Sequence, residues 1–149
     1  MIEKMNEKKK ILVSACLLGN PCRYDGKSKP CEKVIALSQK YELIAVCPES
    51  DGGLPTPRTP SERVGERVLM RDGCDVTENY REGALLALEV CREKRINLAV
   101  LKARSPSCGK GKIYDGSFSG KLVDRSGVTA EMLMDMGIRV LTEEEIDEL

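Results

Sequence analysis

Short apolar segments alternate with helical patterns along most of the chain, and this alternation restricts the fold more than any other feature. Apolar runs typical of buried strands occupy residues 10–16, 42–47, 96–101 and 138–141, where the chain reads KILVSAC, ELIAVC, INLAVL and IRVL. Strands that alternate with helices form parallel sheets covered on both faces. The sequence therefore predicts an α/β fold, a single domain over residues 1–149 with three layers and a mainly parallel, Rossmann-like sheet.

The helices between these strands are predicted from apolar periodicity and from residues typical of helix ends. Residues 32–41 are expected to form one helix, and residues 78–94 a longer one with Thr77 as its N-cap. Thr129 is expected to start a third helix, which Gly137 closes.

Three further segments have their own local signatures. Thr142 and Glu145 have the spacing of a capping box for a short terminal helix. Residues 114–127 are rich in turn residues and predict a hairpin or a loose ribbon. Residues 48–62 hold four of the seven prolines, which predicts a loop without helix or central strand. Loops of that length are often functional.

The composition of the chain argues against several classes of function. Lys plus Arg and Asp plus Glu both number 24, so there is no basic excess for a general grip on nucleic acid. Trp is absent and Phe occurs once, which gives little for stacking on single strands. No apolar run is long enough to cross a bilayer, and the charged residues 1–10, expected to be an N-terminal extension, do not resemble a signal peptide. A soluble, cytoplasmic protein is expected.

Seven cysteines are many for a cytoplasmic chain of 149 residues. An odd number cannot all pair, and the cytosol keeps thiols reduced. Metal or cluster ligation, or thiol chemistry, is therefore favoured over a disulfide framework. Because the chain has no histidine, any site for a soft metal must depend on thiolates.

Three of the cysteines follow three of the predicted strands. Cys16 and Cys47 come at the ends of the first two, and Cys108 lies a few residues beyond the third. The carboxyl ends of parallel strands meet at one edge of a sheet, so these thiols can converge there as a three-thiolate site with an open fourth position. The alternative is that each is a small buried hydrophobic residue.

The other four cysteines carry weaker signals. Cys91 lies on the apolar face of the long helix and is expected in the core, and Cys74 is expected in a turn. Cys31 precedes a helix and has no expected role. Cys22 is near the predicted site and is left open as a fourth ligand, a reactive thiol or neither.

Two polar residues beside the predicted thiol site suggest proton transfer or activation of water. Glu49 follows Cys47 by two residues, and Ser105 precedes Cys108 by three. Each could equally cap a turn. The stretch GKGKIYDG, residues 109–116, lacks the spacing of a P-loop and is expected to be a solvated loop, with an anion cradle as the alternative.

Three segments of the chain, VSACLLGNPCRYDG, CPESDGGLPTPR and ARSPSCGKGKIYDGSFSGKLVDRSGVTAEML, resemble the thiouracil desulfurase family, formerly a domain of unknown function. The resemblance extends from Ile11 to Leu141. It implies a [4Fe–4S] cluster held by Cys16, Cys47 and Cys108, with one iron site open.

The family resemblance also implies the chemistry of the site. It makes Glu49 the acid–base carboxylate and Ser105 the catalytic serine, while Cys22 matches a recurring cysteine of unassigned role. The implied reaction is non-redox hydrolysis of a thiolated pyrimidine such as 2-thiouracil, which gives uracil and hydrosulfide.

Several alternatives remain beside this interpretation. The substrate is expected to be a small thiolated pyrimidine. A thiolated tRNA base is the alternative, because a local group of lysines could attract its phosphates: Lys102, Lys110 and Lys112. No membrane partner is expected, and the sequence does not predict an oligomeric state. Other functions left open are a non-catalytic metal-binding, iron–sulfur-binding or redox-sensing module, and a metal-free thiol enzyme that uses Cys22 or Cys108.

Overall fold

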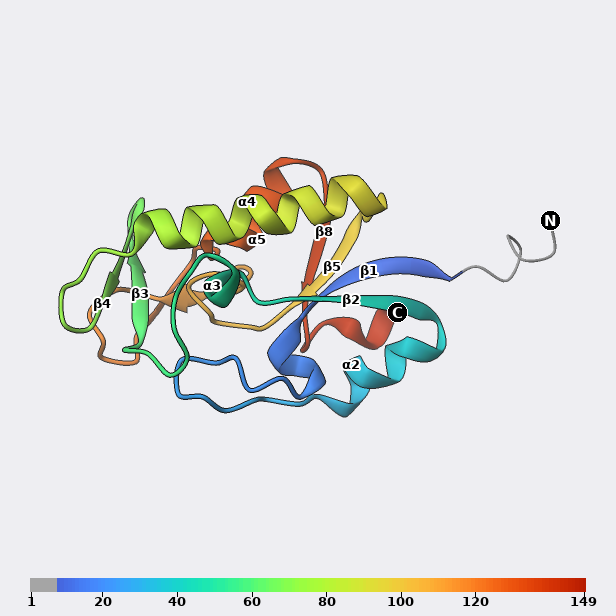
Figure 1. Cartoon of the computed structure of the whole chain (residues 1–149), viewed down its shortest axis with the longest axis horizontal. Helices are drawn as coiled ribbons and strands as arrows, with labels where there is room; N and C mark the ends of the chain where they lie inside the picture. The colour runs from blue at the N-terminus through green and yellow to red at the C-terminus, as the bar shows by residue number, and fades with distance from the viewer. Residues whose placement is uncertain (1–7) are drawn as a thin grey trace.

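The computed structural model describes residues 8–149 (Figure 1). The main elements, in chain order, are β1 (Lys9–Ser14), α2 (Glu32–Ala36), β2 (Tyr41–Val46), α3 (Pro48–Asp51), β3 (Ser61–Val64), β4 (Arg67–Met70), α4 (Thr77–Lys94), β5 (Leu98–Leu101), β6 (Ile113–Tyr114), β7 (Leu122–Val123), α5 (Val128–Asp135) and β8 (Arg139–Thr142). Three short 3-10 helices complete the fold: η1 (Ala15–Leu18), η2 (Leu37–Gln39) and η3 (Ile146–Glu148).

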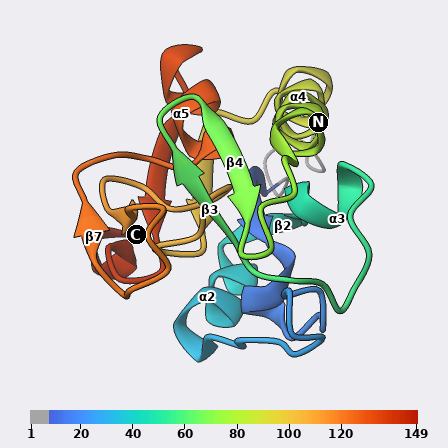
Figure 2. The ribbon, with the colours of Figure 1, turned by 90° about the vertical axis from the view of Figure 1, so that its left-hand side faces the viewer.

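The central sheet has four strands in the order β2-β1-β5-β8, and every neighbouring pair is parallel. Helices α4 and α5 cover one face of the sheet, and α2 lies on the other (Figures 1 and 2). The predicted α/β fold with a mainly parallel sheet and three layers is confirmed.

Alternating side chains of the strands fill two separate apolar cores. On β1, Leu12 packs with Leu88 of α4 and Leu133 of α5. The neighbouring Ile11 packs on the opposite face with Val34 of α2. Successive side chains of a strand point to opposite faces, so a strand covered on both sides must be apolar throughout. This explains why the strand segments are mainly apolar, and why β5, which lies inside the sheet, reads Leu-Ala-Val-Leu with every residue buried.

Two antiparallel hairpins, β3-β4 and β6-β7, stand beside the central sheet. Figure 1 shows β3 and β4 beyond the end at which β2 leads into α3. Of the hairpin and the loose ribbon predicted for residues 114–127, the structure has the hairpin, which begins at Ile113 and has strands of only two residues each. Both hairpins border the site described below.

The segment 48–62 is more ordered than predicted. Its first residues form α3 with Pro48 in the first turn, and its last two open β3. Proline fits the first helical position, because its fixed φ is helical and the N–H it lacks would have no helical partner there. The expectation of a loop without helix was therefore wrong at the start of this segment, whereas β3 at its other end lies in a separate hairpin and not in the central sheet.

The predicted cap of the long helix is also wrong in detail. Thr77 is the first residue of α4 and makes no side-chain cap bond to it; its hydroxyl accepts the Val68 N–H at 2.9 Å instead. Asp75 provides the acceptor at this end, since its carboxylate accepts the Thr77 N–H at 2.9 Å. The threonine therefore ties α4 to β4.

Other element ends differ from the predictions by a few residues. The helix expected over 32–41 ends in the 3-10 turn η2, and Tyr41 already belongs to β2. Gly137 follows α5 in the left-handed region, with φ 84°, as its role in closing a helix requires. Glu145 accepts the Thr142 N–H at 3.0 Å, which is one half of the predicted capping box.

The strand β1 begins within the segment expected to be an N-terminal extension, because Lys9 pairs with Tyr41 of β2. Residues 1–7 lie outside the described part of the chain. Among the helices that the structure describes, none is both long and apolar enough to span a bilayer.

Candidate active site

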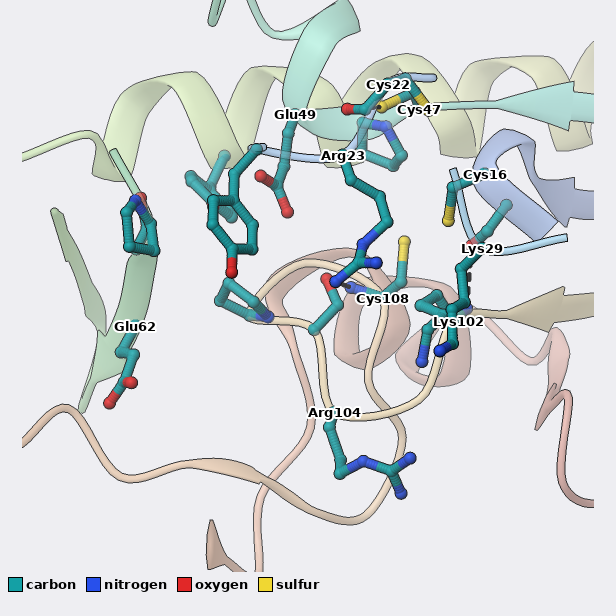
Figure 3. Close-up of a pocket in the computed structure, with 18 of the residues that line it drawn as sticks. Cys16, Cys22, Arg23, Lys29, Cys47, Glu49, Glu62, Lys102, Arg104 and Cys108 are labelled. Atoms are coloured by element: carbon teal, nitrogen blue, oxygen red, sulfur yellow. Dashed lines mark hydrogen bonds between the residues drawn. The ribbon is translucent and has the colours of Figure 1, made fainter. Parts of the chain in front are cut away.

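Four cysteines line one cavity of about 750 Å³ at the carboxyl edge of the sheet (Figure 3). Cys16 lies in η1 directly after β1, Cys47 directly follows β2, and Cys108 lies in the loop after β5. Cys22 joins them from the segment between η1 and α2. The structure therefore brings together the three cysteines selected from the strand ends, and adds Cys22.

The remaining three cysteines lie away from this cavity, in agreement with their weaker sequence signals. Cys91 is 2 % exposed on the buried face of α4, and Cys74 is exposed after the turn that follows β4. Cys31 precedes α2 at its N-cap position. All seven thiols are free.

Burial and mutual contact give the site thiols different acidities. Burial, and then the charge of Cys47, raises the pKa of Cys16 to about 11, and burial raises the pKa of Cys108 to about 12. A hydrogen bond with Cys22 is the main cause that lowers the pKa of Cys47 to about 6, and the same contact raises the pKa of Cys22. Cys47 is therefore the thiol of this group that ionises first.

The thiols that line the cavity do not form a site for a single metal ion. Within residues 8–149, no three Cys, Asp or Glu side chains come close enough together to hold a single metal ion. The cavity nevertheless has four cysteine sulfurs on its walls, against the two carboxylates of Glu49 and Glu62. Thiolates are the donors that iron–sulfur clusters prefer.

Positive side chains reach into the same space. Figure 3 shows Arg23 extending between Cys47 and Cys108, and Lys29 beside Cys16. The charge of Arg23 favours the thiolate form of Cys16 and so opposes the rise of its pKa. Neither Arg23 nor Lys29 was predicted from the sequence, although Arg23 directly follows Cys22.

The loop that carries Cys108 is fixed by its serines. Ser105 Oγ accepts the N–H groups of Ser107 and Cys108, both at 3.1 Å. Ser107 is fully buried, and its hydroxyl is 2.8 Å from that of Thr129 in α5. Gly127 lies so close that a Cβ there would be 2.5 Å from the Ser107 carbonyl oxygen. Ser105 thus holds the turn, as the alternative interpretation expected, and it also lines the cavity.

Glu49 projects into the cavity from α3, which begins directly after Cys47 (Figure 3). Its carboxylate pairs with the Arg58 guanidinium at 2.9 Å, and the Glu49 side chain is 17 % exposed. The buried Tyr80 of α4 stands beside it: burial and the charge of Glu49 raise the pKa of that phenol well above its usual value. Sequence reasoning missed Arg58 and Tyr80, since neither stands next to a cysteine.

Comparison with known proteins identifies the family. The model of the 2-thiouracil desulfurase family matches residues 11–145. The chain belongs to the 2-thiouracil desulfurase family. A solved structure, the [4Fe-4S]-dependent thiouracil desulfidase TudS (DUF523Vcz), has 49 % sequence identity and a TM-score of 0.90, with 95 % of each chain covered. The uncharacterized protein YbbK of Bacillus subtilis (strain 168) is 42 % identical in an alignment that covers 93 % of this chain and 99 % of YbbK.

As a member of the desulfurase family, the chain is a desulfidase enzyme. Its few aromatic side chains are concentrated at the cavity. The chain has four Tyr, one Phe and no Trp. Four of these five line the cavity: Tyr24, Tyr80, Tyr114 and Phe118. Phe118 also carries the Arg71 guanidinium 5.4 Å from its ring centre. The desulfurase pocket therefore combines sulfur donors with flat apolar surfaces.

The three lysines on which the tRNA alternative depended all form ion pairs. Lys102 pairs with Glu143 at 2.9 Å and Lys110 with Glu145 at 3.0 Å. Lys112 pairs with Asp124. The three lysines therefore do not form an uncompensated basic patch.

Proposed function

We propose that this desulfidase removes sulfur from small thiolated pyrimidines such as 2-thiouracil, using a [4Fe–4S] cluster held by Cys16, Cys47 and Cys108. The observation that carries the proposal is that these three thiols, from three different strand ends, line one cavity together with Glu49 and Ser105. A structural relative named as [4Fe-4S]-dependent adds support.

The residues around the cavity fit such a cluster by their chemistry. All the soft donors are thiols, and two of the proposed ligands, Cys16 and Cys108, are at most 7 % exposed, which would shield the cluster from solvent. Three ligands leave one of the four irons without a protein donor. When bound, the cluster would supply a Lewis acid at that iron, which binds and polarises the sulfur of a thiocarbonyl.

The chain's own residues would then move protons. Glu49 accepts a proton from a water molecule while the water oxygen bonds to the thiocarbonyl carbon. The second proton of the water passes through Ser105 to the sulfur. As the carbon–sulfur bond breaks, the carbon becomes a carbonyl and sulfur leaves as hydrosulfide. The products are uracil and hydrosulfide, and no electron is gained or lost.

The hydrogen bonds of the Ser105 hydroxyl suit it to donating a proton. Its oxygen already accepts two backbone N–H groups, so the hydroxyl hydrogen is left for a group inside the cavity. Cys22 has no assigned part in this reaction, because the three strand-end cysteines supply the ligands.

The walls of the cavity favour a flat, small substrate. Tyr24, Tyr114 and Phe118 offer aromatic surface at its edge, on which a pyrimidine ring can stack. A thiolated tRNA base presents the same ring, but the paired lysines around the site give little attraction for its phosphates. We therefore propose the small molecule as the substrate.

The test is an anaerobic assay of reconstituted protein with 2-thiouracil and no added reductant. The expected result is equal amounts of uracil and sulfide, with at least about a hundredfold loss of rate in Glu49→Ala and Ser105→Ala proteins that keep their cluster. A cluster-loaded wild-type protein that releases no sulfide would indicate a binding or redox module instead. Full activity of both variants would refute the two catalytic roles.

A further inference from the structure

The Arg58 guanidinium uses every one of its N–H groups inside the protein. Nε donates to Glu49 Oε1 at 3.2 Å, and Nη2 donates to the same oxygen at 2.9 Å and to the Cys22 carbonyl at 3.0 Å. Nη1 donates to the Pro55 carbonyl at 3.0 Å and to Thr56 Oγ1 at 2.9 Å. These five bonds account for all five donors of an arginine. The guanidinium therefore has one defined position.

Burial and pairing hold the Arg58 guanidinium in this position. The Arg58 side chain is 2 % exposed. A buried cation that loses its partners is costly, so the guanidinium and the Glu49 carboxylate hold each other in place. Both of its bonds to Glu49 end on Oε1, so Oε2 is the oxygen that Arg58 does not use.

Arg58 also joins parts of the site that are separate in the chain. Glu49 belongs to α3, next to Cys47, whereas Cys22 comes from the segment before α2. One guanidinium bonds to both, and it anchors the proline-rich loop at Pro55. Arg58 thus helps to fix the position of the Glu49 carboxylate relative to the segment that carries Cys22.

We propose that Arg58 is the positioning residue of the desulfurase reaction: it acts through Glu49, by holding that carboxylate in one orientation through Oε1, so that Oε2 is left to take the proton of the attacking water. This inference rests on the proposed function. A shift of about 1 Å in a reacting group can cost about a hundredfold in rate, so loss of the clamp affects turnover more than substrate binding.

The first measurement compares Arg58→Lys with wild type after reconstitution, with iron and sulfide contents determined for each. A lysine has three donors and cannot reproduce the five bonds. We expect kcat to fall about ten- to a hundredfold, KM to change less than about threefold, and cluster content to stay equal. Arg63→Lys is the matched control: Arg63 is also buried and paired, with Glu131 at 3.1 Å, but it does not line the cavity.

The second measurement separates positioning from simple stabilisation. If Arg58 acts through Glu49, Arg58→Lys in a Glu49→Gln background should lower kcat by less than about twofold beyond Glu49→Gln alone. The same four proteins are then unfolded in urea, where the two changes should again be less than additive. Thr56→Val removes one Arg58 acceptor and provides a milder variant should Arg58→Lys fold poorly; its kcat is expected to fall between those of wild type and Arg58→Lys.

Each outcome decides the inference. Additive effects on urea unfolding would overturn the Arg58–Glu49 clamp whatever the activity. If wild type is active and the Arg58→Lys and Thr56→Val proteins have the same kcat, the positioning role alone is overturned. The same holds if Arg63→Lys lowers kcat as much as Arg58→Lys does. A cluster-loaded wild type without sulfide release would overturn the proposed function, and the positioning role with it.

Discussion

Gly83 of α4 lies against the backbone of Pro48 in α3, so closely that a Cβ at residue 83 would stand 1.9 Å from the Pro48 carbonyl oxygen. The contact is repeated at the other end of α3, where a Cβ on Gly52 would be 2.0 Å from the Asn79 carbonyl oxygen. The long helix therefore sets the place of the short helix that carries Glu49.

This contact makes Gly83→Ala a diagnostic change. In an unconstrained helix interior, alanine in place of glycine stabilises by about 0.5–1 kcal/mol. Here the new Cβ must push α3 away, so we predict a loss of about 1–3 kcal/mol in the free energy of unfolding and a lower kcat with the cluster retained. Urea unfolding and the sulfide-release assay measure the two effects. A more stable and fully active Gly83→Ala protein would show that α3 does not depend on this contact.

The aromatic rim predicts an effect on substrate binding. Phe118→Leu keeps apolar volume but removes the ring, so KM for 2-thiouracil should rise about three- to tenfold while kcat changes less than about twofold. Tyr41→Leu is the comparison, since Tyr41 lies in β2 and does not line the cavity. An unchanged KM in Phe118→Leu would exclude stacking on this ring.

The start of α4 predicts a pH dependence of stability. Bonds from the Thr77 hydroxyl and N–H, and then from Arg67, lower the pKa of Asp75 to about 2. The folded pKa is below the value of about 3.9 in an unfolded chain, so the ionised group stabilises the fold above pH 4 and this contribution is lost as the pH falls to about 2. The difference in urea midpoint between wild type and Asp75→Asn should be constant from pH 5 to 7 and shrink below about pH 4. If the difference in urea midpoint between wild type and Asp75→Asn grows as the pH falls, the ionised Asp75 does not stabilise the fold.

The cysteines predict a selective pattern of cluster loss. Cys108→Ser removes a proposed ligand and should abolish visible absorption of the reconstituted protein. Cys91→Ser makes the same chemical change at a thiol equally well buried, in the core away from the cavity, and should keep the absorption while lowering stability. Cys22→Ser should keep it as well. Equal loss from Cys108→Ser and Cys91→Ser would point to unfolding rather than to ligation.

The convergence of Cys16, Cys47 and Cys108 could be predicted because it depends on topology. Each thiol follows a strand, and parallel strands end at the same edge of a sheet. Apolar runs are enough to locate such strands, even where the exact ends shift by a residue or two.

The contacts of Arg58 and Tyr80 could not be predicted in the same way. Arg58 reaches Glu49 only because the proline-rich segment folds back after α3, and no periodic pattern describes that path. Tyr80 looks like any apolar position on the inner face of α4. Thr77 shows the same limit, since its hydroxyl is taken by a strand that only the tertiary structure brings near.

The most direct test of the account is the iron and acid-labile sulfide content of protein prepared without air, in wild type and in the triple variant Cys16→Ser/Cys47→Ser/Cys108→Ser. We predict about four iron and four sulfide per wild-type chain, and close to none in the triple variant. A triple variant that binds as much iron and sulfide as the wild type, or a wild type that releases sulfide from 2-thiouracil with no iron bound, would contradict the account.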